Sequence, residues 1–409
     1  MKSIRELYKI GNGPSSSHTM GPKKAAVLFK NTFPSADRYI VTLMGSLALT
    51  GKGHLTDQII LKALEGYTVE IIFDTTTECN THPNTMTFEA FSNNNSIGFW
   101  KVYSIGGGDI KIEGQSENIE EKEIYDLNKF TDIATFCKDN NLNLAEYVYS
   151  KEDSSFLEFL NKIWDAMKSS INNGLNSDGV IPGKLQIQKR AKAIYSSISK
   201  DESEAIRKNR LLLAYSYAVC EENASGGQIV TAPTCGSSGI LPAVLFYAQN
   251  QFNYSDKQII DALAVSGLIG TIIKTNASVS GAECGCQAEV GSACSMAAAA
   301  YSFLQGYDIS IIENSAEIAM EHHLGLTCDP VQGYVQIPCI ERNGAAAIRA
   351  IDSSIMSKII NNGGMISFDT VVDTMYETGK DLSSHYRETS TGGLAKKYVR
   401  NKFYNSSIM

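Results

Sequence analysis

The spacing of apolar residues divides the chain into two unlike halves. In the first half, short alternations of apolar and polar residues recur over 39–43, 69–73 and 86–88, separated by Gly, Asn and Pro. Alternation with a period of two is typical of strands that bury one face. Two segments with helical spacing, 23–29 behind Pro22 and 58–64, lie between them. The first half is therefore predicted to be α+β.

Beyond residue 130 the pattern changes to long segments in which apolar residues recur every three to four positions. These segments are 157–167, 185–220, 259–273, 296–304 and 345–359. Between the halves, residues 109–127 include the acidic positions Glu117, Glu120, Glu121 and Glu123, and are expected to form a solvated connector. We predict a smaller α+β domain over residues 1–128, followed by a larger all-α domain over residues 129–409.

Composition restricts the kind of ligand. The 409 residues carry a net charge of −8 without a cluster of Lys or Arg, which argues against binding of nucleic acid or an anionic membrane. The first residues lack the apolar core of a secretory signal, and the apolar run 262–273 is shorter than the roughly 20 residues of a spanning helix. We expect a cytoplasmic enzyme for a small molecule, and a homodimer, since the helical half is rich in apolar residues.

The cysteines supply the first candidate chemistry. Five of the nine lie between positions 280 and 343, and three of these, Cys286, Cys328 and Cys339, stand beside Gly, Asp or Pro turn residues. Zinc sites usually show paired CxxC motifs, which are absent here. Three separated thiolates suit a [4Fe–4S] cluster whose fourth iron is open and can act as a Lewis acid. The alternative is that these cysteines are buried free thiols in a helical core.

A polar run near the N-terminus supplies the second group of candidate residues. It leads into the helix that is expected to begin near Pro22, and it contains Ser15, Ser16, Ser17, His18 and Thr19. Hydroxyls and backbone N–H groups at a helix start can bind a carboxylate, such as that of an amino acid. The same residues can instead serve only to cap the helix.

Histidine is the side chain best suited to remove a proton near neutral pH. His54 lies among glycines that permit close approach of a ligand, and His18 is the second candidate, for substrate binding or proton relay. The segment that contains His82 and Asn84 is predicted to be a turn because of Pro83.

Polar breaks interrupt the apolar helices at 178–184, 231–239 and 274–282. If such breaks converge, they form a polar pocket inside an apolar body. Lys184, Asn276 and Ser278 would then contact a substrate, although capping or surface roles explain them equally well. Cys235, in the second break, is a possible fourth thiolate ligand.

Several motifs together resemble the iron–sulfur-dependent L-serine dehydratases, also called L-serine ammonia-lyases. SGAECGCQAEVGSAC, LTCDP, IPCIERN and YRETSTGGLA resemble the family's catalytic domain, whereas GPSSSHTMGP, GSLALTGKGHLTD and THPN resemble its smaller domain. The resemblance extends from Gly13 to near Ala395.

This resemblance implies that Cys286, Cys328 and Cys339 hold a [4Fe–4S] cluster with one open iron, and that pyridoxal phosphate is not used. The iron acts as a Lewis acid on the hydroxyl of L-serine, His54 is our first choice for the base that removes the α-proton, and pyruvate and ammonia are the products. The resemblance also suggests that His82 and Asn84 face the active site.

Two other functions are compatible with the same motifs. One is a cluster-dependent elimination from L-threonine or L-cysteine, and the other is a non-catalytic iron–sulfur redox sensor.

The sequence departs from the family pattern in two places. Residues 405–409 lack the C-terminal cysteine of some relatives, and Cys284 is an additional thiol two positions before Cys286.

Overall fold

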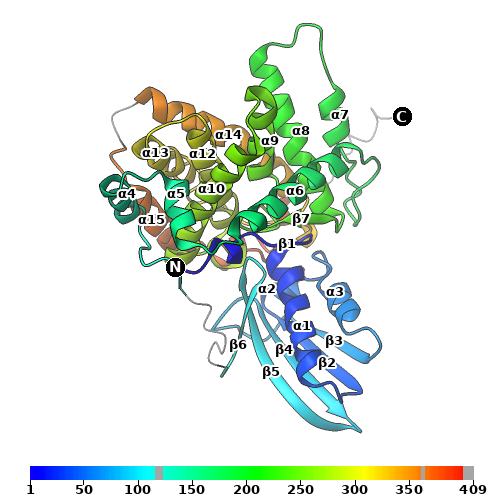
Figure 1. Cartoon of the computed structure of the whole chain (residues 1–409). Coiled ribbons are helices and arrows are strands. Elements are labelled where there is room, and N and C mark those ends of the chain that lie inside the picture. The colour runs from blue at the N-terminus through cyan, green and yellow to red at the C-terminus, as the bar shows by residue number, and fades with distance from the viewer. Residues whose placement is uncertain (116–122, 361–363, 399–409) are drawn as a thin grey trace.

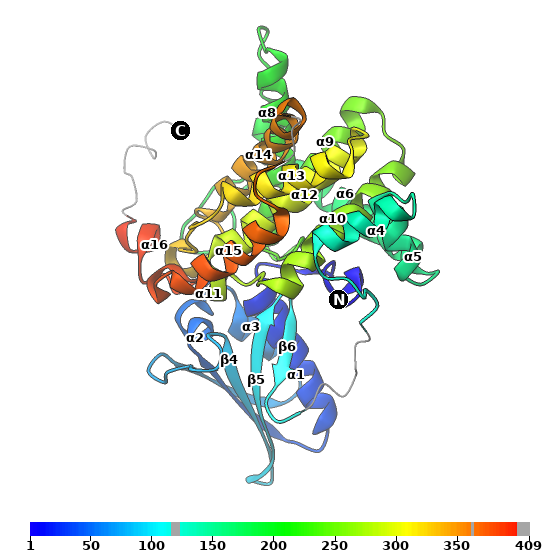
Figure 2. The same ribbon diagram turned by 90° about the vertical axis from the view of Figure 1, so that its left-hand side faces the viewer.

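The computed structural model describes residues 1–115, 123–360 and 364–398. A body of packed helices lies above a smaller part built on one sheet, and the N-terminus lies at their junction (Figure 1). Figure 2 shows the same separation after a quarter turn. The predicted fold class, a small α+β part followed by a larger helical part, is confirmed.

The sheet has five strands in the order β3-β2-β4-β5-β6, of which only β2 and β3 are parallel neighbours. Its strands and helices are β2 (Arg38–Met44), β3 (Thr68–Asp74), β4 (Thr85–Ser92), β5 (Asn95–Gly106), β6 (Asp109–Ile112), α1 (Gly21–Thr32), α2 (Ser46–Thr50) and α3 (Thr56–Ala63). Alternate residues of β2 are fully buried, and Phe29 of α1 and Ile60 of α3 pack in the same cluster. The period-two pattern thus fixes which face the helices cover.

The helical body has a large continuous core and a small separate cluster formed by Ile181, Cys220, Ala224 and Ile340. Its helices are α4 (Phe130–Asp139), α5 (Leu144–Lys151), α6 (Phe156–Leu175), α7 (Ala191–Ser196), α8 (Glu204–Ala224), α9 (Ile240–Phe252), α10 (Asp256–Asn276), α11 (Gly281–Cys284), α12 (Ser292–Leu304), α13 (Ile309–Glu321), α14 (Cys339–Ile360), α15 (Phe368–Asp381) and α16 (Gly393–Lys397). Short turns of 3-10 or π type are η1 (Ile4–Glu6), η2 (Ser16–Met20), η3 (Gln287–Gly291), η4 (Val331–Gly333) and η5 (Ser384–Tyr386).

Helix α10 is largely buried in this core. Ser255 and Gln258 form a reciprocal capping box at its start, which satisfies N–H groups that a helix end leaves unpaired. By length and composition α10 could cross a membrane, yet 78% of its apolar window is buried inside the protein. A helix that is apolar on all sides is expected at the centre of a large core.

The first twelve residues belong structurally to the helical body. Met1, Ile4, Leu7 and Tyr8 are buried in its core, and strand β1 (Ile10–Asn12) pairs with β7 (Gln228–Val230). The chain therefore starts in the helical body, builds the sheet, and returns. The sheet ends at Ile112 and α4 begins at Phe130; a boundary between residues 128 and 129 stays a prediction.

Two expectations about local structure were wrong. The segment 185–220 is not one helix, because α7 ends at Ser196 and α8 begins only at Glu204. The hydroxyl of Ser203 accepts the backbone N–H of Ile206 and caps α8, and short polar side chains of this kind compete with helix continuation.

The second error concerns the connector. Asp109 to Ile112 form the edge strand β6, and the carboxylate of Asp109 pairs with Lys9 and with Lys274, at 2.6 Å. An ion pair between β6 and α10 thus helps to join the two parts. Glu117, Glu120 and Glu121 lie outside the described residues.

Candidate active site

One small cavity lies where the two parts of the molecule meet. Ser15 and His54 come to it from the sheet-bearing part, and the other lining residues come from the helical body. The lining consists of Ser15, His54, Gly236, Cys286, Glu289, Val290, Cys328, Pro330, Val335, Cys339 and Glu388. Groups more than 200 residues apart in sequence therefore face one another across a domain junction.

The three cysteines selected from the sequence all line this cavity. Cys286 follows Gly285, whose φ of +73° places the turn between α11 and η3 in a region that favours glycine. Cys328 lies in the loop after α13, and Cys339 is the first residue of α14. Cys286 and Cys328 are buried, whereas Cys339 is partly exposed.

Glu289 is a half-buried residue whose carboxyl group lies beside these thiols. Its ligand atom and those of Cys286 and Cys328 lie within 4.8 Å of one another, and Thr234 Oγ1 donates to its Oε1 at 2.7 Å. Gly281 leaves room for this side chain, because a Cβ there would lie 2.5 Å from Glu289 Oε2. Burial raises the pKa of Glu289 above its usual value.

The thiols are crowded against one another. A hydrogen bond with Cys286 and burial raise the pKa of Cys328 well above its usual value, and burial followed by the nearby Cys286 does the same for Cys339. Coordination of a metal would replace the protons of these two thiols, so the raised pKa values of Cys328 and Cys339 are compatible with a metal site.

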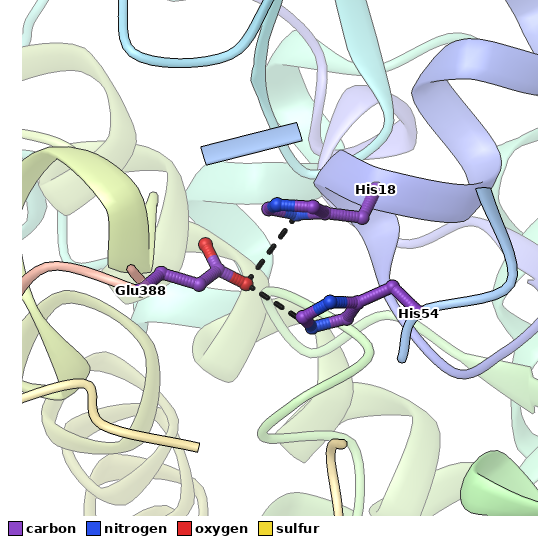
Figure 3. A group of neighbouring side chains, drawn as sticks. All are labelled: His18, His54 and Glu388. Carbon is purple, nitrogen blue, oxygen red and sulfur yellow. Dashed lines mark ion pairs between the residues drawn. The ribbon is translucent and has the colours of Figure 1, made fainter. Parts of the chain in front are cut away.

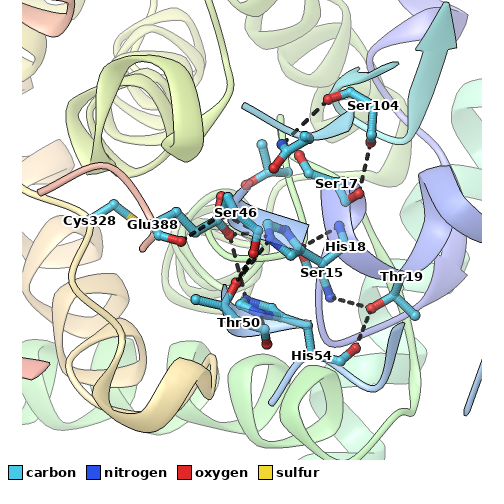
Figure 4. Close-up of polar contacts among 12 residues, drawn as sticks. Ser15, Ser17, His18, Thr19, Ser46, Thr50, His54, Ser104, Cys328 and Glu388 are labelled. Carbon is cyan, nitrogen blue, oxygen red and sulfur yellow. Dashed lines mark hydrogen bonds and ion pairs between the residues drawn. The ribbon is translucent and has the colours of Figure 1, made fainter. Parts of the chain in front are cut away.

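The hydrogen bonds of His18 determine its tautomer. Ser46 Oγ donates its proton to the carbonyl of Glu388 at 2.7 Å, and Thr50 Oγ1 donates to the carbonyl of Ser46 at 2.9 Å. Both hydroxyls can therefore only accept from His18 Nε2, at 3.1 and 3.0 Å (Figure 4). His18 carries its proton on Nε2, and Nδ1 keeps its lone pair.

His54 has the complementary arrangement. Its Nδ1 lies 3.0 Å from the carbonyl of Thr50, which can only accept, so the proton is on Nδ1 and Nε2 is free. Burial lowers the pKa of His54 to about 4, and burial with the neighbouring His54 lowers the pKa of His18 well below its usual value. The two rings stack with centroids 4.3 Å apart. His54 is the histidine that lines the cavity.

Both free nitrogens face the same carboxyl oxygen. Glu388 Oε1 lies 3.5 Å from His18 Nδ1 and 3.6 Å from His54 Nε2 (Figure 3). Burial, followed by repulsion from Glu289 and Cys286, raises the pKa of Glu388 well above its usual value. The group therefore favours a protonated carboxyl beside two neutral imidazoles.

The residues of the polar run before α1 have two roles: Ser15 lines the cavity, and its neighbours hold the surrounding backbone in place. Ser15 lines the cavity, and its Oγ accepts the backbone N–H of His18 at 3.1 Å. Thr19 Oγ1 donates to the carbonyl of His54 at 2.9 Å, and the carbonyl of Ser17 accepts from a hydroxyl of β5. Ser16 is buried at the start of η2. Capping and site formation thus occur in the same turn.

His82 and Asn84 lie beside an adjoining open cleft rather than in the cavity. His82 lines this cleft together with Ser46 and Arg387, and its Nδ1 accepts the backbone N–H of Asn84 at 3.0 Å. Asn84 is fully buried, and no hydrogen bond to its Oδ1 is found among the described residues. Ser46 belongs to the cleft and also contacts His18, so the cleft reaches the histidine group from its outer side.

The other three predicted substrate contacts lie elsewhere. Lys184 is exposed. The amide of Asn276 donates to the carbonyls of Asn128 and Ile272, at 2.6 and 3.0 Å, and so joins the end of α10 to the connector. Ser278 Oγ donates to Glu283 at 2.6 Å. Asn276 and Ser278 thus satisfy backbone and carboxyl groups, and none of the three residues lines the cavity.

The remaining cysteines of interest are packed. Cys235 is buried with its Sγ 3.5 Å from Met20 Sδ, although the next residue, Gly236, lines the cavity. Cys284 packs closely against Gly379 of α15, and Cys294 is buried in α12.

Sequence reasoning missed Glu388, Glu289, Ser46 and Thr50. Glu388 and Ser46 lie inside the quoted segments YRETSTGGLA and GSLALTGKGHLTD, so a signal was present without an assigned role. Glu289 was detectable as a lone acid in an apolar run three positions after Cys286.

Comparisons with known proteins identify the family of this chain. The profile of the serine dehydratase beta chain matches residues 3–72, and that of the serine dehydratase alpha chain matches residues 113–395. An L-serine dehydratase of Haemophilus influenzae is 38% identical over 98% of this chain and 100% of its own length. An L-serine dehydratase of Helicobacter pylori is 39% identical over 96% and 98%, and L-serine dehydratase 2 of Escherichia coli is 38% identical over 98% and 99%.

These matches extend over nearly the whole chain and over both of its parts, in the order in which the fold presents them. The chain belongs to the serine dehydratase family, and it unites the beta-type and alpha-type parts in a single polypeptide.

Proposed function

We propose that this protein is an L-serine ammonia-lyase that converts L-serine to pyruvate and ammonia. The observation that carries the proposal is the single cavity in which His54 from one part of the molecule faces Cys286, Cys328 and Cys339 from the other. Relatives that are 38–39% identical over nearly their whole length are named L-serine dehydratases. We therefore propose L-serine as the substrate, in preference to L-threonine and L-cysteine. We also prefer an enzymatic function to that of a redox sensor.

The cysteines fit a [4Fe–4S] cluster. Three thiols converge, two from loops and one from the start of α14. The positively charged guanidinium of Arg342, which pairs with Asp329 at 3.0 Å, lies near them. Cys286, Cys328 and Cys339 would hold three irons, and the cluster when bound would supply one open iron as a Lewis acid for the substrate hydroxyl. Among the described residues, no lysine lines the cavity, and a lysine is what pyridoxal phosphate needs for its Schiff base.

His54 is the proposed base. Its Nε2 has a free lone pair at the cavity, and its low pKa keeps that lone pair available at neutral pH. When His54 takes the α-proton, the electron pair of the broken C–H bond forms the Cα=Cβ double bond, and the β-hydroxyl leaves with the electrons of the C–O bond. The products are aminoacrylate and, once the hydroxide is protonated, water. Aminoacrylate tautomerises to an imine, which water hydrolyses to pyruvate and ammonia.

One lining group is suited to hold the carboxylate of an amino acid. The hydroxyl of Ser15 can donate to that carboxylate from the cavity wall, whereas Asn84 does not line the cavity and its contact with the substrate stays a prediction. We assign His18 to support of His54 rather than to contact with the substrate, because His18 does not line the cavity.

Cytoplasmic location and a homodimer also belong to the proposal. Exposed apolar side chains follow one another near the end of α14 and before α15, namely Ile355, Met356, Ile359, Ile360, Met365 and Ile366. An exposed apolar patch of this kind is typical of a protein interface. Measurement of molecular size in solution tests the proposed homodimer, and a monomer at micromolar concentration would exclude that homodimer.

The decisive experiment is anaerobic purification, followed by measurement of iron, sulfide, absorption spectrum and pyruvate release in the same sample. We expect about four iron and four sulfide per chain, with pyruvate released from L-serine, and joint loss of the absorption band and of activity in air. An intact cluster without pyruvate from L-serine would refute the proposed activity. A colourless protein after anaerobic reconstitution would refute the cluster.

A further inference from the structure

The open cleft beside the histidine group has the size of a small-molecule site. Its volume is about 370 Å³, within the range of roughly 300–1,000 Å³ that is typical of ligand pockets. The sheet-bearing part contributes Ser46 and His82 to its lining, and the helical body contributes Ala282, Arg387 and Thr389. Like the cavity, the cleft therefore lies between the two parts of the molecule.

Arg387 gives this cleft its charge. Among the described residues that line the cleft, Arg387 is the only one whose side chain carries a full charge, and its side chain is half-buried. Its guanidinium donates to the carbonyl of Glu283 at 3.3 Å, and no ion pair with a carboxylate is found for it in the described part of the chain. The carboxylate of Glu283 accepts from Ser278 at 2.6 Å and does not line the cleft. A guanidinium has five N–H donors in a fork that matches a carboxylate, so Arg387 is suited to bind an anionic group in the cleft.

His82 adds a second donor. Its Nδ1 accepts the backbone N–H of Asn84 at 3.0 Å, so the neutral ring carries its proton on Nε2. Burial lowers the pKa of His82, which keeps the ring neutral at neutral pH. Its Nε2 is buried, and no partner for this atom is found among the described residues. A buried donor without a partner costs free energy, and a ligand that accepts its hydrogen removes that cost.

Ser46 connects the cleft with the histidine group. It lines the cleft, and its Oγ accepts from His18 Nε2 at 3.1 Å and donates to the carbonyl of Glu388 at 2.7 Å (Figure 4). Glu388 lines the cavity, whereas its two neighbours Arg387 and Thr389 line the cleft. The cleft and the cavity therefore lie on opposite sides of the segment 387–389.

We propose that this cleft is the entry site for L-serine, and that Arg387 binds the carboxylate of the substrate there, with Nε2–H of His82 as a second donor. A charged donor and a neutral donor fit a carboxylate, and no acidic side chain among the described lining residues repels it. The entry site thus selects amino acids over amines that carry the same hydroxyl group without a carboxylate. This inference rests on the proposed lyase activity.

The test compares Arg387→Gln with wild type after anaerobic reconstitution. Glutamine removes the charge and the forked donors, so we expect kcat/KM for L-serine to fall about 10- to 100-fold, the usual contribution of hydrogen bonds to charged groups. We expect kcat to stay within about twofold of wild type, because a binding contact outside the cavity affects KM alone. Iron content and the cluster absorption band should be unchanged.

Two further variants accompany Arg387→Gln. Arg387→Lys keeps the charge but loses the fork, so its kcat/KM should fall by a smaller factor. Arg207→Gln, at an exposed position on α8 outside the cleft and the cavity, is the matched control and should resemble wild type.

Two small molecules separate carboxylate recognition from a purely structural role. L-alanine keeps the carboxylate but lacks the hydroxyl that leaves, whereas 2-aminoethanol lacks the carboxylate. L-alanine should compete with L-serine, and its inhibition constant should rise in Arg387→Gln by the same factor as KM. The inhibition constant of 2-aminoethanol should be equal in both proteins. Without any turnover, L-alanine should raise the unfolding temperature of wild type more than that of Arg387→Gln.

Three outcomes would overturn the inference. They are unchanged kcat/KM in Arg387→Gln, an equal loss of affinity for L-alanine and 2-aminoethanol, and loss of iron in proportion to activity. Thr81→Trp is a second test, because it places a large ring at an exposed position of the cleft lining, and unchanged kcat/KM in this variant would exclude the cleft as the entry site. Wild type is assayed first. Absence of pyruvate there would refute the activity itself, whereas the unfolding temperatures with L-alanine still test Arg387.

Discussion

The two walls of the cavity are stabilised in different ways. On the histidine wall, both rings are buried, and hydroxyl or carbonyl groups fix their tautomers. On the cysteine wall, the thiols have one another, Glu289 and Arg342 as polar neighbours. The pKa of Cys328 is raised by its hydrogen bond with Cys286 and by burial, and the pKa of Cys339 is raised by burial first. The protein alone organises the histidine wall, whereas the cysteine wall has the form of a site completed by a metal cluster.

The largest expected effect is on the cysteine wall. Cys286→Ala should lose the cluster and with it all detectable activity, because one of only three protein ligands is removed. Cys284→Ala is the matched control, since its thiol packs against Gly379 outside the cavity, and it should keep about four iron per chain. Iron and sulfide analysis with the absorption spectrum measures both. Equal iron loss in the two variants would contradict the ligand assignment.

The histidine wall should respond differently. His54→Asn should lower kcat by about 10²- to 10⁴-fold while iron content is unchanged, because it removes the base and leaves the thiols in place. His322→Asn, at an exposed histidine, should behave as wild type. If His54→Asn lost iron as well, the two walls would not be independent.

A smaller effect is expected in the dependence of stability on pH. In the folded protein His54 has a pKa of about 4, below the unfolded value of 6.5, so the unfolded chain binds more protons between these values. Stability should therefore decrease as pH falls from about 6.5 to 4, by roughly 3 kcal/mol from this group alone. Denaturant titrations of metal-free wild type and His54→Asn at several pH values measure it. The variant should lose less stability over this range, and an equal loss in both proteins would exclude a buried neutral His54.

The smallest effects concern positions away from both walls. Lys184→Ala should leave kcat unchanged and should change the free energy of unfolding by no more than about 0.5 kcal/mol, because the side chain is exposed. Asn276→Ala removes two hydrogen bonds to backbone carbonyls and should cost about 1–2 kcal/mol of stability while kcat/KM for L-serine is retained. Steady-state kinetics and chemical unfolding measure these outcomes. A tenfold loss of kcat/KM in either variant would indicate that the substituted residue contacts the substrate after all.

Local periodicity was enough to predict much of the fold. The alternation over 39–43, 69–73 and 86–88 identified β2, β3 and β4, because a strand that buries one face must alternate. Long helical spacing identified α6, α10, α12 and α14. Local signals failed where polar side chains decide between continuation and a break, as at Ser203, and where an acidic residue finds distant partners, as Asp109 does with Lys9 and Lys274.

The sequence by itself determined which residue types could carry the chemistry: cysteines placed at turns, a histidine among glycines, and a run of hydroxyls before a helix. Only the tertiary structure decided which of them meet. It brought Ser15, His54 and the three cysteines into one cavity, left Lys184 and Asn276 outside it, and added Glu388 and Glu289. The physical reason is that a buried polar group needs partners, and those partners come from segments hundreds of residues apart, which no local pattern records.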